Sequence, residues 1–348
     1  HTSHGGKLSV VRVLSGSIHD GTVLKDGEGN EVKVSGLQSV FGQDTHRADA
    51  ASAGDTVGLA KLESVKTGDT LSSAGGGGLA LVETPSPVLA LSVAAKERKD
   101  EVKLAASLAK LIDEDPSLSL DHNQTTGEMV LSGQGDMHLR VALEKLMTKY
   151  GVSAEAKRPR VGYCETIRKS TSVRGRHKKQ SGGHGQFGDV VLDIKALPRG
   201  TGFVFDNTIT GGVVPKQYIP SVEAGIREYL SKGPLGFPVI DVGVTLTDGS
   251  YHTVDSSDMA FRTAAQIGMR EGMPQCSPVL LEPIMAVEIH VPSDATARLN
   301  QIVSQRRGQI LGFDARPGWE GWDTVNVHLP EAEIGDLIEF CEQSDLKG

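Results

Sequence analysis

Residues 128–151 read EMVLSGQGDMHLRVALEKLMTKYG, a pattern that predicts a strand, a turn and a helix in direct succession. Leucines at 139, 143 and 146 fall on one stripe of the helix. We expect Asp136 to cap its start and Gly151 to end it. No Lys follows Gly133-Gln134-Gly135, so these glycines favour a strand-to-helix turn over a phosphate loop.

The flanking segments extend this unit into a domain. Upstream, 88–93 predicts a strand, leucines at 104, 108 and 111 mark a helix that ends before Asp115-Pro116, and 117–120 forms a hairpin with 128–131. Downstream, 152–156 supplies a last strand. The resulting order, βαββαβ, is that of a ferredoxin-like domain.

The same order begins again near the C-terminus. Strands are predicted at 284–291, 309–313 and 323–329, and helices at 295–305 and 331–340. No sixth element follows, so we expect a second, C-terminally truncated ferredoxin-like domain, whose missing strand would leave an uncovered sheet edge. Arg306-Arg307-Gly308 fits a helix end, with Gly308 as the left-handed residue.

Residues 8–72 differ in pattern, because short Val-rich runs alternate with Gly and Asp turns. Such spacing predicts a small β-barrel or sandwich. Gly75 to Gly78, followed by Pro85 and Pro87, marks a boundary.

The middle of the chain, 164–283, mixes both kinds of element. Strands are predicted at 162–167, 186–194, 202–206 and 239–246, and helices at 219–230, with Pro220 in its first turn, and around 258–269. Two loops then lie at strand ends, HKKQSGGHGQFG at 177–188 and GSYHTVDSS at 249–257. We expect Asp255-Ser256-Ser257 to cap the second helix.

Charge singles out the first loop. Residues 157–180 hold nine Lys or Arg against one acid, Glu165, in a chain whose formal net charge is −8. Most such runs are solvated faces, but here glycines adjoin the cations and allow close backbone approach to phosphate. The loop has no nucleophile–base pair, so it favours binding a polyanion, and we interpret it as a nucleic-acid contact.

Size and composition limit the other possibilities. A chain of 348 residues with 38% hydrophobic residues predicts two or three domains or more. No apolar run approaches the ~18 residues that span a membrane, and no signal segment opens the chain. Three scattered cysteines without CxxC spacing argue against disulfides and zinc. We expect a cytoplasmic protein, and one that belongs to a longer chain because His1 replaces an initiator Met.

Several stretches together resemble bacterial elongation factor G, in family order over nearly the whole chain. They are GQGDMHL at 133–139, QSGGHGQFG at 180–188, GGVVP at 211–215, YIPSVE at 218–223, SYHTVDSS at 250–257, PVLLEPI at 278–284 and SQRRG at 304–308. The resemblance implies a multidomain β and α+β chain: a partial β-barrel at 1–84, a ferredoxin-like domain at 85–160, a domain like the second domain of ribosomal protein S5 at 161–282, and a truncated ferredoxin-like domain at 283–348.

In that family the third of these parts enters the decoding site, and its tip helps to move tRNA and mRNA during translocation. The resemblance implies a monomer that contacts no membrane and whose partners are the ribosome, with its rRNA and ribosomal proteins, tRNA and mRNA. By match of motif, the contacting tip comprises Lys178, Lys179, Gln180, Ser181, Gly182, Gly183, His184, Gly185, Tyr251, His252, Thr253 and Val254. A glycine loop beside an aromatic residue and a His also suits exposed RNA on chemical grounds.

The GTPase part of the family has no counterpart in this sequence. No Gly-x-x-x-x-Gly-Lys-Ser/Thr occurs, since the sole Gly-Lys, Gly6-Lys7, is followed by Leu8. We therefore expect no catalytic, cofactor-binding or metal-binding residue on this chain, and GTP and Mg²⁺ on a GTPase domain outside it.

Departures from the family keep alternatives open. His184 stands where the family usually carries Arg, and weak similarity at 20–80 and 312–330 allows a paralogue that serves ribosome recycling, stalled ribosomes or ribosome protection. A hydrolase that uses His184 or His252 with Asp255 is a rival of another class, although no Gly-x-Ser-x-Gly accompanies them. A third possibility is an RNA-binding protein that never carried a GTPase domain.

Overall fold

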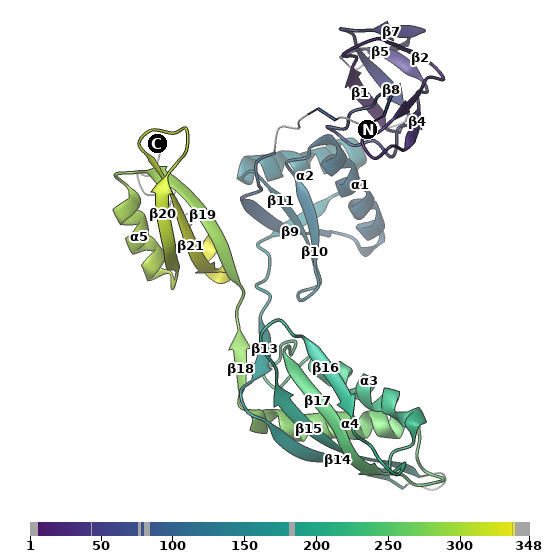
Figure 1. Cartoon of the computed structure of the whole chain (residues 1–348), viewed down its shortest axis with the longest axis vertical. Coiled ribbons are helices and arrows are strands. Elements are labelled where there is room, and N and C mark those ends of the chain that lie inside the picture. The colour runs from purple at the N-terminus through teal and green to yellow at the C-terminus, as the bar shows by residue number, and fades with distance from the viewer. Residues whose placement is uncertain are drawn as a thin grey trace. The chain divides into compact units, whose positions relative to one another are not determined.

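The computed structural model describes residues 6–42, 44–75, 78–79, 84–180, 185–335 and 337. The chain divides into two compact units, 1–160 and 161–348, each of which is described by itself. Figure 1 labels their helices and strands.

The N-terminal part is built from short strands around a small aliphatic core. One sheet has the order β1-β8-β5-β6, and β2–β7 and β3–β4 form two further pairs. Leu37 and Leu59 are almost completely buried at its centre. The strands are β1 (Leu8–Arg12), β2 (Ser17–His19), β3 (Val23–Lys25), β4 (Glu31–Lys33), β5 (Leu37–Phe41), β6 (Asp44–Arg47), β7 (Ala50–Ser52) and β8 (Thr56–Ala60).

The next part has the predicted βαββαβ order. Its elements are β9 (Leu89–Ala95), α1 (Glu101–Glu114), β10 (Ser119–Asn123), β11 (Glu128–Gly133), α2 (Asp136–Tyr150) and β12 (Ala154–Lys157), with a short 3₁₀ turn at Arg98–Asp100. The antiparallel sheet has the order β10-β11-β9-β12, and Leu residues of both helices pack on one face. The ferredoxin-like prediction is confirmed.

One detail of this prediction is wrong, because Asp136 does not cap α2. Gly135, at φ 153°, is the capping residue and provides no side chain, while Asp136 is already helical and pairs with Arg140 at 2.8 Å. His138 fixes the turn instead. Its Nδ1 accepts the N–H of Gln134 at 3.1 Å, and its Nε2 lies 2.9 Å from an Asp115 carboxylate oxygen at the end of α1.

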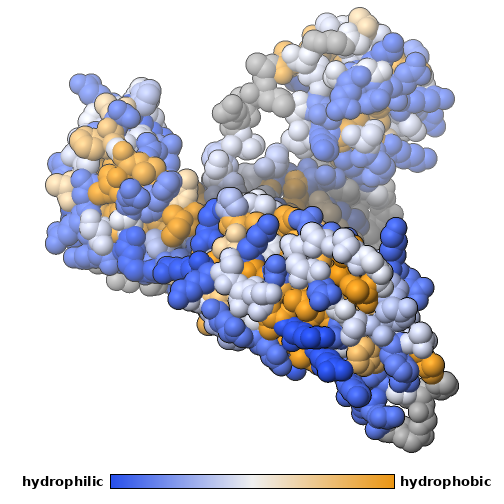
Figure 2. Space-filling view, turned by 60° about the horizontal axis from the view of Figure 1, so that its bottom comes forward, coloured by the Kyte–Doolittle hydropathy of each residue, from blue (hydrophilic) through white to orange (hydrophobic). Residues whose placement is uncertain are grey.

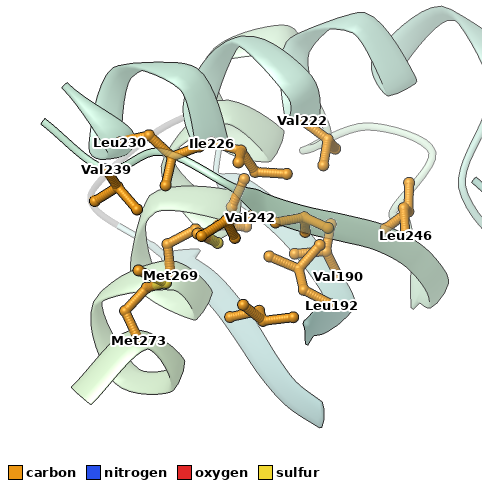
Figure 3. Close-up of a cluster of buried hydrophobic side chains, with 14 of the residues drawn as sticks. Val190, Leu192, Val222, Ile226, Leu230, Val239, Val242, Leu246, Met269 and Met273 are labelled. Carbon is orange, nitrogen blue, oxygen red and sulfur yellow. The ribbon is translucent and has the colours of Figure 1, made fainter. Parts of the chain in front are cut away.

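The middle part is a four-stranded sheet covered on one face by two helices (Figure 1), and Figure 3 shows a cluster of the buried side chains between them. Its elements are β13 (Cys164–Ile167), β14 (Thr171–Lys179), β15 (Gln186–Ala196), β16 (Phe203–Asn207), α3 (Ile219–Leu230), β17 (Val242–Ser250), α4 (Asp258–Gly272) and β18 (Pro278–Leu281), with 3₁₀ turns at Lys216–Tyr218 and Met273–Cys276. The sheet order is β14-β15-β17-β16, and β13 pairs separately with β18. Side chains from α3, α4, β15 and β17 point toward one another in the core.

Sequence patterns did not predict β14. Its residues alternate between exposed cations and half-buried side chains, and no apolar stripe marks it. Pairing with β15 from Thr171–Ile194 to Lys179–Gln186 forms the strand, and α4 packs against it. A Cβ on Gly175 would overlap the Ala264 carbonyl oxygen and come within 2.5 Å of the Gly268 nitrogen, so only glycine fits there.

The C-terminal part repeats the ferredoxin-like order as far as the structure describes it. β19 (Ile284–Pro292), α5 (Thr296–Gln305), β20 (Gln309–Ala315) and β21 (Trp322–Pro330) form a sheet of order β19-β21-β20. Helical turns follow at 331–335 and 337, and the rest of the predicted helix lies outside the described residues.

The prediction for the end of α5 is wrong in one respect. Arg307, at φ 58°, is the left-handed residue, and it binds Glu282 through two N–H groups. Gly308 is required for space instead, since a Cβ there would come within 2.5 Å of a Val303 methyl group.

Candidate nucleic-acid interface

The two glycine-containing loops meet at one end of the middle part, where the β14–β15 hairpin and the loop after β17 lie together (Figure 1). The N–H of Gly185 donates to Asp255 Oδ1 at 3.0 Å. The N–H of Phe187 donates to the Asp255 carbonyl at 2.8 Å, and the Ser256 hydroxyl donates to the Phe187 carbonyl at 2.9 Å. Side chain and backbone together therefore hold the loops as one structure.

Most of the predicted contact residues are exposed there. Lys178 and Lys179 end β14, Gln180 follows them, and Gly185 is half-buried against Asp255. The second loop contributes four exposed residues, Tyr251, His252, Thr253 and Val254. Ser181, Gly182, Gly183 and His184 lie outside the described residues.

His252 shapes its own loop through one ring nitrogen. Nδ1 lies 3.3 Å from the N–H of Val254 and 3.2 Å from the N–H of Asp255, so a neutral ring that accepts these groups carries its proton on Nε2. The same nitrogen lies 3.2 Å from an Asp255 carboxylate oxygen. The histidine and aspartate of the hydrolase hypothesis are thus adjacent, and both are bonded to the loop backbone.

The hydroxyl of Ser256, the residue after Asp255, is also engaged. Ser256 Oγ accepts the N–H of His252 at 2.9 Å and donates to the Phe187 carbonyl. A nucleophile would instead have to hydrogen-bond to a ring nitrogen that can take its proton. These hydrogen bonds are those of a loop held in one conformation by its own backbone and side chains.

Cations continue from the tip along the open face of the sheet. Side chains two residues apart on a strand share one face, which places Arg174, Arg176 and Lys178 in a row. The Arg176 guanidinium lies 5.4 Å from the centre of the Phe187 ring, and that ring lies 6.4 Å from the His252 ring. A cation, an aromatic ring and an imidazole therefore adjoin at the base of the tip, an arrangement that sequence patterns did not predict.

The row is anchored by a buried carboxylate. Asp189 has an exposed fraction of 0% and accepts two hydrogen bonds from Arg174 and one from Ser250 Oγ. Burial alone would raise the pKa of Asp189, but the hydrogen bonds from Arg174 and Ser250 outweigh it and lower that pKa. Strands β14, β15 and β17 are thereby joined where the hairpin begins.

The structure reduces the number of cations available to a partner. Arg174 neutralises Asp189, Arg160 binds Glu128 at 3.1 Å, and Lys157 lies 3.1 Å from Glu155. Arg176, Lys178 and Lys179 remain beside the loops, with no carboxylate within 4.0 Å among the described residues. The tapering end of the middle part is correspondingly hydrophilic over most of its visible surface (Figure 2).

Metal clusters and membrane-spanning helices are both absent from the part of the chain that the structure describes. Its residues contain no group of three or more His, Cys, Asp or Glu side chains that could hold a metal ion. None of its helices is both long enough and apolar enough to cross a membrane.

Four family models match the chain in succession. Residues 2–74 match elongation factor G domain 2, 84–158 match domain III, 159–277 match domain IV, and 279–340 match the elongation factor G C-terminus.

Individual proteins agree with these models. A protein from Synechocystis sp. described as elongation factor G-like is 53% identical over 333 residues, which cover 96% of this chain and 49% of the relative. A crystal structure of a protein from Thermus thermophilus superposes with a TM-score of 0.76 at 35% identity, covering 97% of this chain and 51% of that one. The chain thus spans about half the length of these two proteins.

Proposed function

Because the chain belongs to the elongation factor G family, we propose that it acts on the ribosome and that its paired loops contact RNA while tRNA and mRNA move. The single observation that carries this proposal is the hydrogen bond between Gly185 and Asp255, which joins the two loops. It makes one exposed tip out of two segments that are 70 residues apart.

The chemistry of the tip supports RNA as the partner. Exposed RNA is bound by cations that contact phosphate, by backbone donors, and by aromatic or imidazole rings that stack on bases. Lys178 and Lys179 supply charge, Tyr251 and His252 supply exposed rings, and the Phe187 ring lies behind them. Phosphate contacts of this kind give salt-sensitive binding without sequence preference.

The remainder of the function belongs to the whole protein. We propose that GTP hydrolysis, with GTP and Mg²⁺, takes place in a domain outside this sequence, and that this chain supplies the parts that bind the ribosome. We also propose a monomer that works in the cytoplasm, with parts divided at residues 84, 160 and 282.

Binding to purified bacterial 70S ribosomes tests the proposal. The chain should pellet with ribosomes at low salt, and the double variant Lys178→Glu, Lys179→Glu should not do so at physiological salt. The slope of log K against log salt is negative, and each lost phosphate contact should reduce its magnitude by about 1. The matched control is Lys195→Glu with Lys232→Glu, two exposed residues of the same part away from the tip, and it should bind like the parent chain.

Equal binding by the tip variant and the control variant would remove the assignment of the tip. Translocation and subunit-splitting assays, with the variants placed in the full-length protein, then distinguish a translocase from a recycling factor.

A further inference from the structure

Residues 316–322, which are the turn between β20 and β21 and the first residue of β21, contain both tryptophans of the chain. Trp319 has an exposed fraction of 51%, and Trp322 is half-buried. Among the residues of this part that the structure describes, the buried core is aliphatic and contains neither tryptophan ring. The loop that holds them extends beyond the end of its sheet (Figure 1).

The turn is held in one conformation. The N–H of Arg316 donates to the Trp322 carbonyl at 2.7 Å, and the N–H of Trp319 donates to the Arg316 carbonyl at 3.1 Å. The Gly321 carbonyl accepts the N–H of Ser293 at 2.9 Å, which ties the turn to the loop before α5. Binding by a segment already fixed in this way loses little conformational entropy.

The side chains of the turn are also ordered against one another. The Arg316 guanidinium lies 4.3 Å from the centre of the Trp319 ring, and the two Trp rings meet edge to face at 5.6 Å. Trp and Arg are the residues that most often dominate the energy of protein interfaces. On the adjoining edge strand, Leu311 and Phe313 are 53% and 57% exposed, which adds apolar surface to the same hairpin.

Local charge favours a protein over a nucleic acid. Residues 309–323 contain one cation, Arg316, and three acids, Asp314, Glu320 and Asp323. The wider segment 283–335 holds four Lys or Arg against seven acids. This surface repels phosphate and complements a basic protein surface, which is the opposite of the charge at the β14–β15 tip.

We propose that residues 316–322 form a second contact, in which Trp319 enters an apolar pocket on a basic protein surface. Arg316 holds the Trp319 ring in place, and Asp314 and Glu320 supply charge opposite to the basic rim. This inference depends on the proposed function in one respect, because it takes the partner to be a protein of the ribosome.

Photo-crosslinking to bacterial 70S ribosomes tests it directly. The full chain would carry p-benzoylphenylalanine in place of Trp319, in place of Lys179 as a positive control at the RNA-binding tip, or in place of the exposed Val102 as a background control. We expect the probe at position 319 to give adducts that are sensitive to protease and resistant to nuclease. The probe at position 179 should give adducts with RNA.

Each outcome decides between the two proposals. RNA adducts or background labelling at 319, with RNA adducts at 179, would overturn the second contact and leave the first in place. Protein adducts at 319 without RNA adducts at 179 would support the second contact and contradict the first. Background labelling at both positions would overturn both.

A binding measurement gives an independent result. Trp319→Ala should weaken ribosome binding about tenfold, the order expected for a hot-spot residue, and should leave the salt slope unchanged. Trp319→Phe keeps a ring and should lose less. Circular dichroism of both variants checks folding, and binding by Trp319→Ala within twofold of the parent chain would contradict the proposal.

Discussion

The backbone N–H of Gly185 and the Oδ1 of Asp255 are joined across 3.0 Å, so the β14–β15 hairpin and the loop after β17 share one hydrogen-bonded base. A Cβ on Gly185 would lie 2.8 Å from the Asp255 carboxyl carbon, which shows how closely the two segments approach. The same aspartate receives the N–H of Phe187 on its backbone oxygen.

Replacing Asp255 should therefore loosen the tip without unfolding the domain. Asp255→Ala removes the acceptor of the Gly185 N–H, a hydrogen bond to a charged group with an expected contribution of about 1.5–3 kcal/mol. Hydrogen exchange should accelerate at Gly185 while the amides of α3 and α4 stay protected. Asp255→Asn keeps an oxygen in place and is the control; equal protection of Gly185 in both variants would show that the bond does not hold the loop.

The contact between β14 and α4 should tolerate no side chain at Gly175. Gly175→Ala places a methyl group against the Ala264 carbonyl and the Gly268 nitrogen, so strand and helix must separate. We expect a loss of about 1–3 kcal/mol in the free energy of unfolding, as for overpacked cores. Urea denaturation measures it. Gly27→Ala, where no atom lies within 4 Å, is the control, and a similar small change in both variants would contradict the close contact.

Asp189 should make stability depend on pH in the acid range. Its pKa is lowered in the folded state, so the stabilisation is complete above its ordinary value of 3.8 and is lost as pH falls through the lower, folded-state pKa. Asp189→Asn should cost about 1–3 kcal/mol at pH 7, because the buried site keeps its Arg174 and Ser250 partners without the charge.

The measurement is the difference in free energy of unfolding between Asp189→Asn and the parent chain from pH 7 to pH 2.5. The difference should be constant down to about pH 4 and shrink below it. A constant difference over the whole range would mean that the Asp189 charge contributes nothing.

His252 should support no hydrolysis. Its Nδ1 is occupied by backbone N–H groups, and the nearby Ser256 hydroxyl is bonded to backbone groups and not to the His252 ring. Purified chain should hydrolyse p-nitrophenyl acetate and p-nitrophenyl phosphate no faster than His252→Asn does. Turnover that is lost in that variant would support the hydrolase hypothesis and would contradict a purely structural role of His252 in its loop.

Sequence patterns predicted most helices and strands because each carries an apolar stripe or an alternation of its own. They missed β14, whose exposed face is cationic and whose other face holds Gly175 in place of an apolar side chain. That strand exists because of its partners: β15, which follows it across the hairpin loop, and α4, which lies far from it in sequence. Local patterns cannot report such an element.

The errors at helix ends have a similar cause. Asp136 suits a capping position by residue type, but Gly135 at φ 153° takes that place and leaves Asp136 inside the helix. Arg307 adopts the left-handed conformation in place of Gly308 because it reaches Glu282 and Glu333, while Gly308 is needed for its lack of a side chain.

The site itself was foreseen in part. The paired loops were proposed from glycine, charge and family resemblance, and the predicted roles of Lys178, Lys179, Gln180, Gly185 and residues 251–254 remain predictions. The supports behind them, Asp189 with Arg174 and Phe187 with Arg176, were not foreseen. A buried acid on a strand, Asp189 between Gly188 and Val190, was the available signal.

The glycine contact between β14 and α4 has a mechanical consequence. Where side chains separate two elements, a push on one is partly absorbed as those side chains change rotamer. Here the backbone of β14 rests on the backbone of α4 at Gly175 against Gly268, and the backbone of β15 does so at Gly188 against Ala260. A close-packed contact between backbones deforms little under load. A force applied to the end of the hairpin would therefore be transmitted to α4 with little local deformation, and the middle part would move as a rigid body.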